Sequence, residues 1–400
     1  MEETFYWDSC RINVKTSAGD PTPIRFWKAA VLIGLPLFLI LSLSIYCQLM
    51  LPGPDGPYHV ARTVLKWVDT SRPEVLTEDP NDFREVVALI WYPAEAGSGA
   101  EAGYFPNIDA VSQALIESGE LEWWQVLALR FIRSESPVDA NPLREQAPFP
   151  VIILSPGNGT NIEFYSSLAS EIASHGYVVM GLNHPYDVPA VELSGGEIAP
   201  YNKNQWSLDG AAHQAYSAER IKVRVADVLY ALDQLAEINS TGPFAGLIDL
   251  DAVAAAGHSL GGITASEACK ADTRFKACLN YDGLQKGGPF SIEQTAIPPE
   301  QPFMFLTKED QLHPRLLERF ESMPEGYWVV VHDASHQSFT DGPLLQPSLL
   351  PGPNQADRLM DSIQKYSLAF FDHTLKRQPA GLLLKTVDQK DVSVKVFPSN

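Results

Sequence analysis

The sequence is poor in basic side chains and in cysteine. Its 400 residues include 29 lysines and arginines against 49 aspartates and glutamates, a formal net charge of −20. A nucleic-acid-binding protein needs a cationic face that neutralises phosphates, so this balance argues against such a partner. The four cysteines have no CxxC or His-x-His partner pattern. Their spacing indicates neither a zinc site nor a disulfide scaffold, and we expect four small buried side chains.

Several cofactor motifs are also missing. The chain has no phosphate-binding glycine loop, dinucleotide-binding fingerprint or EF-hand spacing, so we expect no cofactor and no metal ion. What the chain does have is ordinary globular composition, with 45% hydrophobic and 20% charged residues. That composition excludes a disordered chain and is sufficient for a packed core.

One long uncharged segment lies near the N-terminus, at residues 29–51. As a helix it would be about 34 Å long, enough to cross a bilayer core of about 30 Å. The segment is longer than the apolar part of a cleaved signal peptide, and Tyr46 stands where a lipoprotein signal needs a small residue, so we expect an uncleaved anchor. Basic residues are slightly more numerous before this segment than after it, which favours a cytoplasmic tail at residues 1–28 and places the chain that follows the segment outside the cytoplasm.

Short apolar runs alternate with helical segments from residue 149 onward. Runs such as VIIL, VVMGL and FMFL are continuously apolar, which is typical of parallel strands buried on both faces. We therefore expect an α/β fold, with a mostly parallel central sheet and helices on both faces, in one domain at residues 58–400. Paired strands are expected earlier, at residues 73–80 and 84–93, and a ragged end after the last helix.

A helical stretch is expected at residues 108–133. It contains several leucines together with Trp123, Trp124 and Phe131. Such a segment either packs on the core, forms a lid, or offers an apolar surface to lipid or a lipid-like substrate.

The clearest chemical motif is Gly257-His258-Ser259-Leu260-Gly261, a G-x-S-x-G sequence. It follows an apolar run and precedes a helix-compatible stretch, the strand, turn and helix context in which this motif exposes a nucleophilic serine. The N-terminus of the following helix favours the negative charge that develops during attack. We therefore expect the predicted sheet to belong to an α/β-hydrolase fold, with Ser259 as a nucleophile and Gly257 and Gly261 as the glycines that permit the turn.

A serine hydroxyl needs a general base, which in this fold comes from a loop late in the chain. His332 still belongs to a predicted strand, whereas His336 follows it in a loop, so His336 is the expected base. The acid that orients this histidine has two candidate positions, Asp282 after one strand and Glu309 with Asp310 after the next. Spacing does not decide between them.

Five fragments in the right order resemble the plasma and intracellular type II platelet-activating-factor acetylhydrolases. LSPGNG resembles a strand end of that family, SLASEIASHGYVVMGLNHP its next helix and strand, GHSLGG its elbow, RFKACLNYDG its acid-bearing strand and ASHQSFTD its histidine loop. Together they cover roughly residues 149–341. The resemblance implies that Asp282 is the acid. It also implies a short or oxidised acyl ester as substrate, such as the sn-2 chain of a phospholipid.

An oxyanion hole in this fold needs two backbone N–H groups. Leu260, directly after the nucleophile, supplies the first, and the resemblance assigns the second to Asn158. The chain departs from the family here, because Pro156 replaces a histidine and Asn158 replaces an apolar residue. Because the change affects only the side chain, the backbone N–H of Asn158 is still present. The polar side chain leads us to expect a more polar acyl pocket beside it.

Other polar residues are expected to be structural. His184 and Asp187 follow a strand, and we expect them in a satisfied loop, with the acyl pocket as the alternative. Arg220, Lys222 and Arg224 are spaced along a helix, which is typical of a solvated face.

Taken together, the motifs predict a membrane-anchored serine esterase with a small-molecule or lipid ester as its substrate. Two alternatives stay open. The first is a non-catalytic binding ectodomain on the same fold, and the second is an acyltransferase that uses the same acyl-enzyme.

Overall fold

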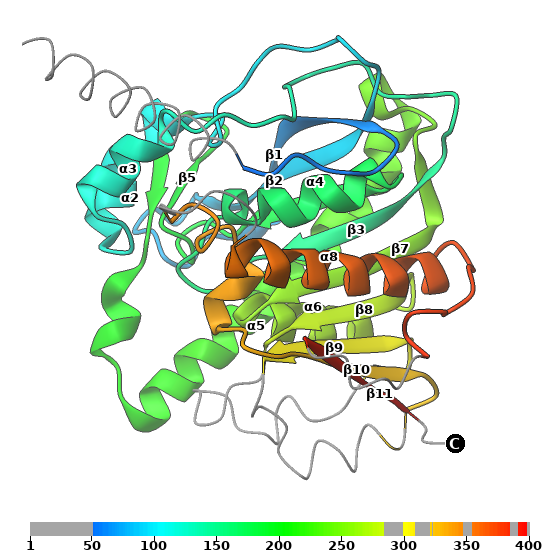
Figure 1. Cartoon of the computed structure of the whole chain (residues 1–400). Helices are drawn as coiled ribbons and strands as arrows, with labels where there is room; N and C mark the ends of the chain where they lie inside the picture. Colours follow the sequence, from blue (N-terminus) through cyan, green and yellow to red (C-terminus); the bar gives the residue numbers. More distant parts are fainter. Residues whose placement is uncertain are drawn as a thin grey trace, which may run out of the picture. The chain divides into compact units, whose positions relative to one another are not determined.

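The fold is built on a nine-stranded sheet (Figure 1). The structure is a computed structural model that describes residues 51–283, 299–308, 321, 323–346, 354–384 and 391–397. Six adjacent strands run parallel, in the order β4 (Val178–Asn183), β3 (Phe149–Ser155), β7 (Ile248–His258), β8 (Phe275–Tyr281), β9 (Phe303–Lys308) and β10 (Gly326–Val331). The antiparallel strands β1 (His59–Pro73) and β2 (Phe83–Ala94) extend one edge, and β11 (Val392–Phe397) extends the other.

Helices cover both faces of this sheet (Figure 1). One face carries α4 (Ser166–Ser174) and α8 (Gln355–Thr374), and the other carries α5 (Gly210–Ser240) and α6 (Leu260–Ala271). In β3, Ile152 and Leu154 pack into the first core, whereas Val151 and Ile153 pack into the second. Burial on both faces is why the apolar runs are continuous. The prediction of a mostly parallel sheet with helices on both faces is confirmed.

Several short elements complete the described chain. They are α2 (Ile108–Ser118), α3 (Trp123–Leu129), the hairpin β5 (Ala190–Glu192) and β6 (Ile198–Pro200), and the 3₁₀ turns η1 (Ile162–Tyr165), η2 (Lys203–Ser207), η3 (Gly242–Phe244) and η4 (His336–Phe339). The predicted helical stretch at residues 108–133 is thus two helices. Gly119 ends α2 with a φ of 79°, a left-handed conformation that glycine adopts without a steric penalty.

Both edges of the sheet differ from the prediction. Residues 73–80 form no strand apart from the last residue of β1, and β1 itself pairs with β2. The expected ragged end contains β11, which pairs with β10. In β11, Val392 and Val394 are buried while Lys395 is exposed. Edge strands of this kind show period-two alternation rather than a continuous apolar run, and that pattern was missed.

One disulfide corrects the prediction for the cysteines. Cys269 in α6 is bonded to Cys278 in β8. The expectation that all four cysteines are small unpaired side chains is wrong for this pair. Their pairing depends on how α6 packs against β8, which the spacing of nine residues does not reveal.

The predicted tail, residues 1–28, and nearly all of the predicted anchor, residues 29–50, lie outside the described residues. A search of the described chain finds no helix with the length and apolar character required to span a bilayer.

Candidate active site

Ser259 lies at the sharp turn between β7 and α6. Its φ of 56° is a conformation that non-glycine residues rarely adopt and that recurs at functional sites. The flanking glycines allow this turn. A Cβ atom at Gly257 would lie 2.1 Å from the carbonyl oxygen of Gly261, and one at Gly261 would lie 2.1 Å from the carbonyl oxygen of Ser155. Because both obstacles are backbone atoms, neither position has room for a side chain.

The structure brings Ser259, His336 and Asp282 into one chain of hydrogen bonds. The Nε2 atom of His336 lies 3.0 Å from Ser259 Oγ, and its Nδ1 atom lies 2.6 Å from Asp282 Oδ2. Asp282 follows β8, and His336 is the first residue of η4, which follows β10. Because β8 and β10 run parallel, both residues lie at the edge of the sheet where the strands have their carboxyl ends. The other candidate acids, Glu309 and Asp310, lie outside the described residues.

This geometry assigns the histidine tautomer. Asp282 is fully buried, and its carboxylate accepts the Nδ1–H of His336. The Nε2 lone pair then faces the Ser259 hydroxyl, as a general base requires.

His258, the residue before the nucleophile, packs against this histidine. The ring centroids of His258 and His336 are 4.5 Å apart. Burial, and next the neighbouring His336, lower the pKa of His258 well below its ordinary value. His258 therefore stays neutral and places no second charge beside the base. Its Nδ1 lies 2.8 Å from the hydroxyl of Tyr165.

The loop at residues 155–159, which we name the oxyanion loop after its predicted role, lies beside Ser259. A Cβ atom at Gly157 would lie 3.5 Å from the Cβ of Ser259. The Gly157 N–H donates to Tyr165 Oη at 2.9 Å. Asn158 is the next residue of this loop, and Leu260 is the first residue of α6. Both predicted oxyanion donors thus belong to segments that border Ser259.

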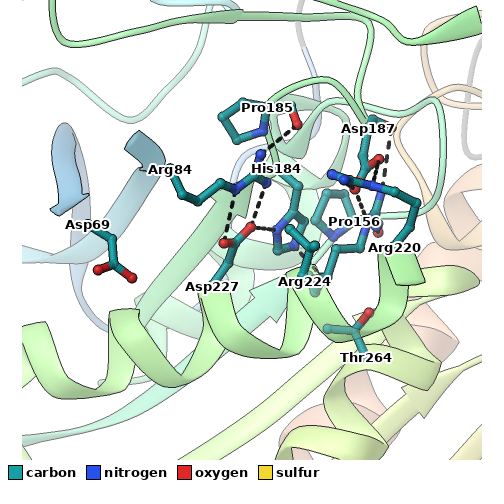
Figure 2. A network of polar contacts seen from close by, with 12 residues as sticks. Asp69, Arg84, Pro156, His184, Pro185, Asp187, Arg220, Arg224, Asp227 and Thr264 are labelled. Carbon is teal, nitrogen blue, oxygen red and sulfur yellow. Dashed lines mark hydrogen bonds and ion pairs between the residues drawn. The ribbon is translucent and has the colours of Figure 1, made fainter. Parts of the chain in front are cut away.

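Behind the oxyanion loop lies a buried network of charged residues (Figure 2). Asp187 binds Arg220 through Nε at 2.7 Å and Arg224 through Nε at 3.1 Å. Arg220 and Arg224 are only 4% and 0% exposed, so their predicted place on a solvated helix face is wrong. Lys222, on the opposite side of α5, is exposed as predicted. The signal that was missed is the four-residue spacing of the two arginines, which puts them on one face.

A second part of the network contains His184 and Asp227 (Figure 2) and holds Ser155, the first residue of the oxyanion loop. The ring of His184 bonds Ser155 Oγ through Nε2 at 2.8 Å and Asp227 through Nδ1 at 2.9 Å. Burial lowers the pKa of His184 to about 4, so this ring is neutral near pH 7. Although burial alone would raise it, the charge of Arg84 helps to hold the pKa of Asp227 well below its usual range. Both His184 and Asp187 thus occupy satisfied structural positions.

One group of possible metal ligands comes together in the described ranges. Asp55, Glu171 and His175 have ligand atoms within 4.8 Å of one another. Glu171 already accepts hydrogen bonds from the Asp55 N–H at 3.0 Å and from His175 Nε2 at 2.9 Å. These contacts account for the group as an ordinary ion pair.

Comparisons with known proteins agree on one family. Residues 46–380 match the family model described as platelet-activating factor acetylhydrolase, isoform II. A probable 1-alkyl-2-acetylglycerophosphocholine esterase from Arthroderma benhamiae is 24% identical over 380 residues, which cover 85% of this chain and 92% of the relative. The platelet-activating factor acetylhydrolase of Cavia porcellus is 25% identical over 364 residues, covering 81% of this chain and 78% of the relative.

A solved structure shares the fold. The ferulic acid esterase from Streptomyces cinnamoneus superposes with a TM-score of 0.68 at 23% identity, covering 86% of this chain and 98% of that chain.

Proposed function

Because the chain belongs to the platelet-activating factor acetylhydrolase, isoform II, family and is a serine carboxylic-ester hydrolase, we propose that Ser259, His336 and Asp282 are its catalytic residues. The Ser259 oxygen attacks the ester carbonyl carbon while its proton passes to His336 Nε2. Asp282 holds the imidazole and stabilises the imidazolium that forms. The protonated His336 then gives its proton to the departing alcohol. Water, deprotonated by the same nitrogen, attacks the acyl-enzyme and releases the carboxylic acid.

The observation that carries this assignment is the unbroken chain of hydrogen bonds through the histidine. Its two links, 3.0 Å to Ser259 and 2.6 Å to Asp282, fall within the range that proton transfer requires. A binding ectodomain has no need for these contacts, so they favour catalysis. Family membership favours water over an alcohol as the acyl acceptor.

The backbone N–H groups of Leu260 and Asn158 form the oxyanion hole in this proposal. Leu260 is the first residue of α6. The first backbone N–H groups of a helix have no partner within the helix, and they favour a negative charge placed near them. Asn158 is supported by its place in a loop that borders Ser259. Each such donor stabilises a transition state by roughly 3 kcal/mol.

The substrate we propose is a phospholipid with a short or oxidised sn-2 acyl chain. The name of the fungal relative refers to a 2-acetyl glycerophosphocholine, which supports this class. Helix α3 and the residues directly after it add a reason to expect access to lipid. Trp123, Trp124 and Phe131 are 63%, 56% and 60% exposed, an apolar surface that is unusual for a segment facing only water.

We further propose that residues 29–51 anchor the protein in a membrane, with a tail at residues 1–28 and a catalytic domain at residues 58–400 outside the cytoplasm. The uncharged length of the segment supports the anchor. The disulfide between Cys269 and Cys278 supports the side of the membrane, since such bonds persist mainly in oxidising compartments.

A chain-length series tests the proposed substrate. The full chain would be assayed on p-nitrophenyl esters and on phosphatidylcholines whose sn-2 acyl chain grows from two carbons, with Ser259→Ala as the control. We expect kcat/KM to fall steeply beyond very short acyl groups. Equal rates along the series, or a preference for long chains, would contradict the substrate class while leaving the triad in place.

A further inference from the structure

We propose that Arg224 is a positioning residue for catalysis, which together with Asp187 fixes the place of the Asn158 N–H. This inference rests on the proposed function, because it assumes that Asn158 donates to the oxyanion. It goes further by giving a catalytic purpose to an ion pair that never touches the reacting atoms.

The ion pair between Arg224 and Asp187 (Figure 2) holds the oxyanion loop by hydrogen bonds on both sides of Asn158. On one side, Arg224 Nη1 donates to the carbonyl oxygen of Pro156 at 2.8 Å. On the other side, the Gly159 N–H donates to the carbonyl oxygen of Asp187 at 3.0 Å. Arg224 joins these two holds, because its Nε donates to Asp187 Oδ2 at 3.1 Å and its Nη2 to the Asp187 carbonyl at 3.3 Å.

The buried position of Arg224 makes its hydrogen bond to the oxyanion loop strong. Arg224 is fully buried, and hydrogen bonds from a charged donor are strong where water is excluded. Pro156 has no N–H, so its carbonyl is the only backbone group through which that residue can be held by a hydrogen bond. Two further hydrogen bonds of the loop, between Ser155 and His184 and from Gly157 to Tyr165, join neutral groups.

Arg220 is a matched control supplied by the chain itself. It lies one helical turn earlier on α5, is also buried, and binds both carboxylate oxygens of Asp187, at 2.7 and 3.1 Å. Among the contacts found in the described part of the chain, those of Arg220 do not include the oxyanion loop. The two arginines therefore share a charge and a carboxylate partner, and they differ in the bonds that Arg224 makes to the carbonyl oxygens of Pro156 and Asp187.

The variants Arg224→Lys and Arg220→Lys keep the positive charge but lose the several N–H donors of the planar guanidinium group. Loss of a whole oxyanion donor lowers kcat by about 10²–10³-fold. A displaced donor retains part of its effect, so we expect Arg224→Lys to lower kcat by about 30-fold. We expect KM to change by less than about threefold, because the donor acts mainly on the charge of the transition state. For Arg220→Lys we expect kcat within about threefold of the wild type.

The test uses the full chain with p-nitrophenyl acetate as substrate. A fluorophosphonate titration counts the competent active sites first, so that unfolded protein does not lower the apparent kcat. A second readout is the inhibition constant of an alkyl trifluoromethyl ketone, whose serine adduct carries an oxyanion. If Arg224 positions the donor, this constant rises in Arg224→Lys by about the same factor as kcat falls.

Equal losses of kcat in the two lysine variants would overturn the inference, as would an unchanged affinity for the trifluoromethyl ketone in Arg224→Lys. If that variant yields no soluble protein, Asp187→Asn takes its place in the same comparison, and the same pattern against Arg220→Lys is expected. A wild-type chain that neither hydrolyses the ester nor reacts with the fluorophosphonate contradicts the proposed function instead, so the two failures are distinguishable.

Discussion

Asp282→Asn replaces one buried carboxylate oxygen of the proposed triad by a nitrogen of nearly the same size. In the wild type, Asp282 Oδ2 lies 2.6 Å from His336 Nδ1. The substitution removes the negative charge of this carboxylate, whereas His336 becomes positively charged when it takes the serine proton. With charge centres about 4 Å apart and an effective dielectric constant of about 20, their attraction is about 4 kcal/mol. That energy corresponds to about a thousandfold in rate.

A second effect adds to this loss. The amide can turn its NH₂ group toward Nδ1, which favours the wrong tautomer of His336, and the same change in a serine protease triad lowers kcat by about 10⁴. We therefore expect kcat of Asp282→Asn to fall by about 10³–10⁴-fold, with little change in KM.

The assay is p-nitrophenyl ester hydrolysis, normalised to folded protein by near-UV circular dichroism. The control is Asp310→Asn, because Asp310 is the alternative acid that spacing alone leaves open. We expect the control to retain nearly full activity. If Asp310→Asn loses several orders of magnitude and Asp282→Asn does not, the assignment of the acid is refuted.

Three further predictions concern the elbow, a buried carboxyl and the surface of α3. Gly261→Ala is expected to abolish esterase activity, because its Cβ would lie 2.1 Å from a backbone carbonyl oxygen; Gly381→Ala, whose new Cβ would come no closer than 3.9 Å to any atom of the described chain beyond its own neighbours, should stay active. Burial raises the pKa of Asp341 from 3.8 to about 7, so the folded state favours the neutral carboxyl. The contribution of this group to the free energy of unfolding is therefore fully present below pH 3.8 and is lost as the pH rises through 7. Urea unfolding should show the wild type losing about 4 kcal/mol relative to Asp341→Asn between pH 4 and 7.5, and a difference independent of pH would refute this. Replacing Trp123 and Trp124 by glutamine should lower hydrolysis of vesicle phospholipid by about tenfold or more and leave soluble esters unaffected; equal losses on both substrates would argue against a lipid-facing surface.

Local patterns were sufficient to predict the proposed nucleophile and the proposed base, which the structure places 3.0 Å apart. Ser259 is defined by its two glycines and by the strand and helix around it, all within a dozen residues. His336 follows from its place in a loop after an apolar strand. The choice of Asp282 as the proposed acid required the resemblance, because Asp282 and Asp310 both follow predicted strands of the same parallel sheet and periodicity treats them alike.

Features that depend on distant partners could not be predicted in this way. Arg220 and Arg224 resemble any solvated helix face until Asp187, more than 30 residues away, is placed against them. The disulfide between Cys269 and Cys278 likewise depends on the contact between α6 and β8. Both cases need the packing of two elements, which a pattern within one element does not contain.

The most direct measurement is fluorophosphonate labelling of the full chain, with the modified residue located by mass spectrometry. Wild-type protein is expected to carry one adduct, on the oxygen of Ser259, and Ser259→Ala is expected to carry none. Absence of labelling in the wild type, or undiminished labelling in Ser259→Ala, would contradict the assignment of Ser259 as the nucleophile.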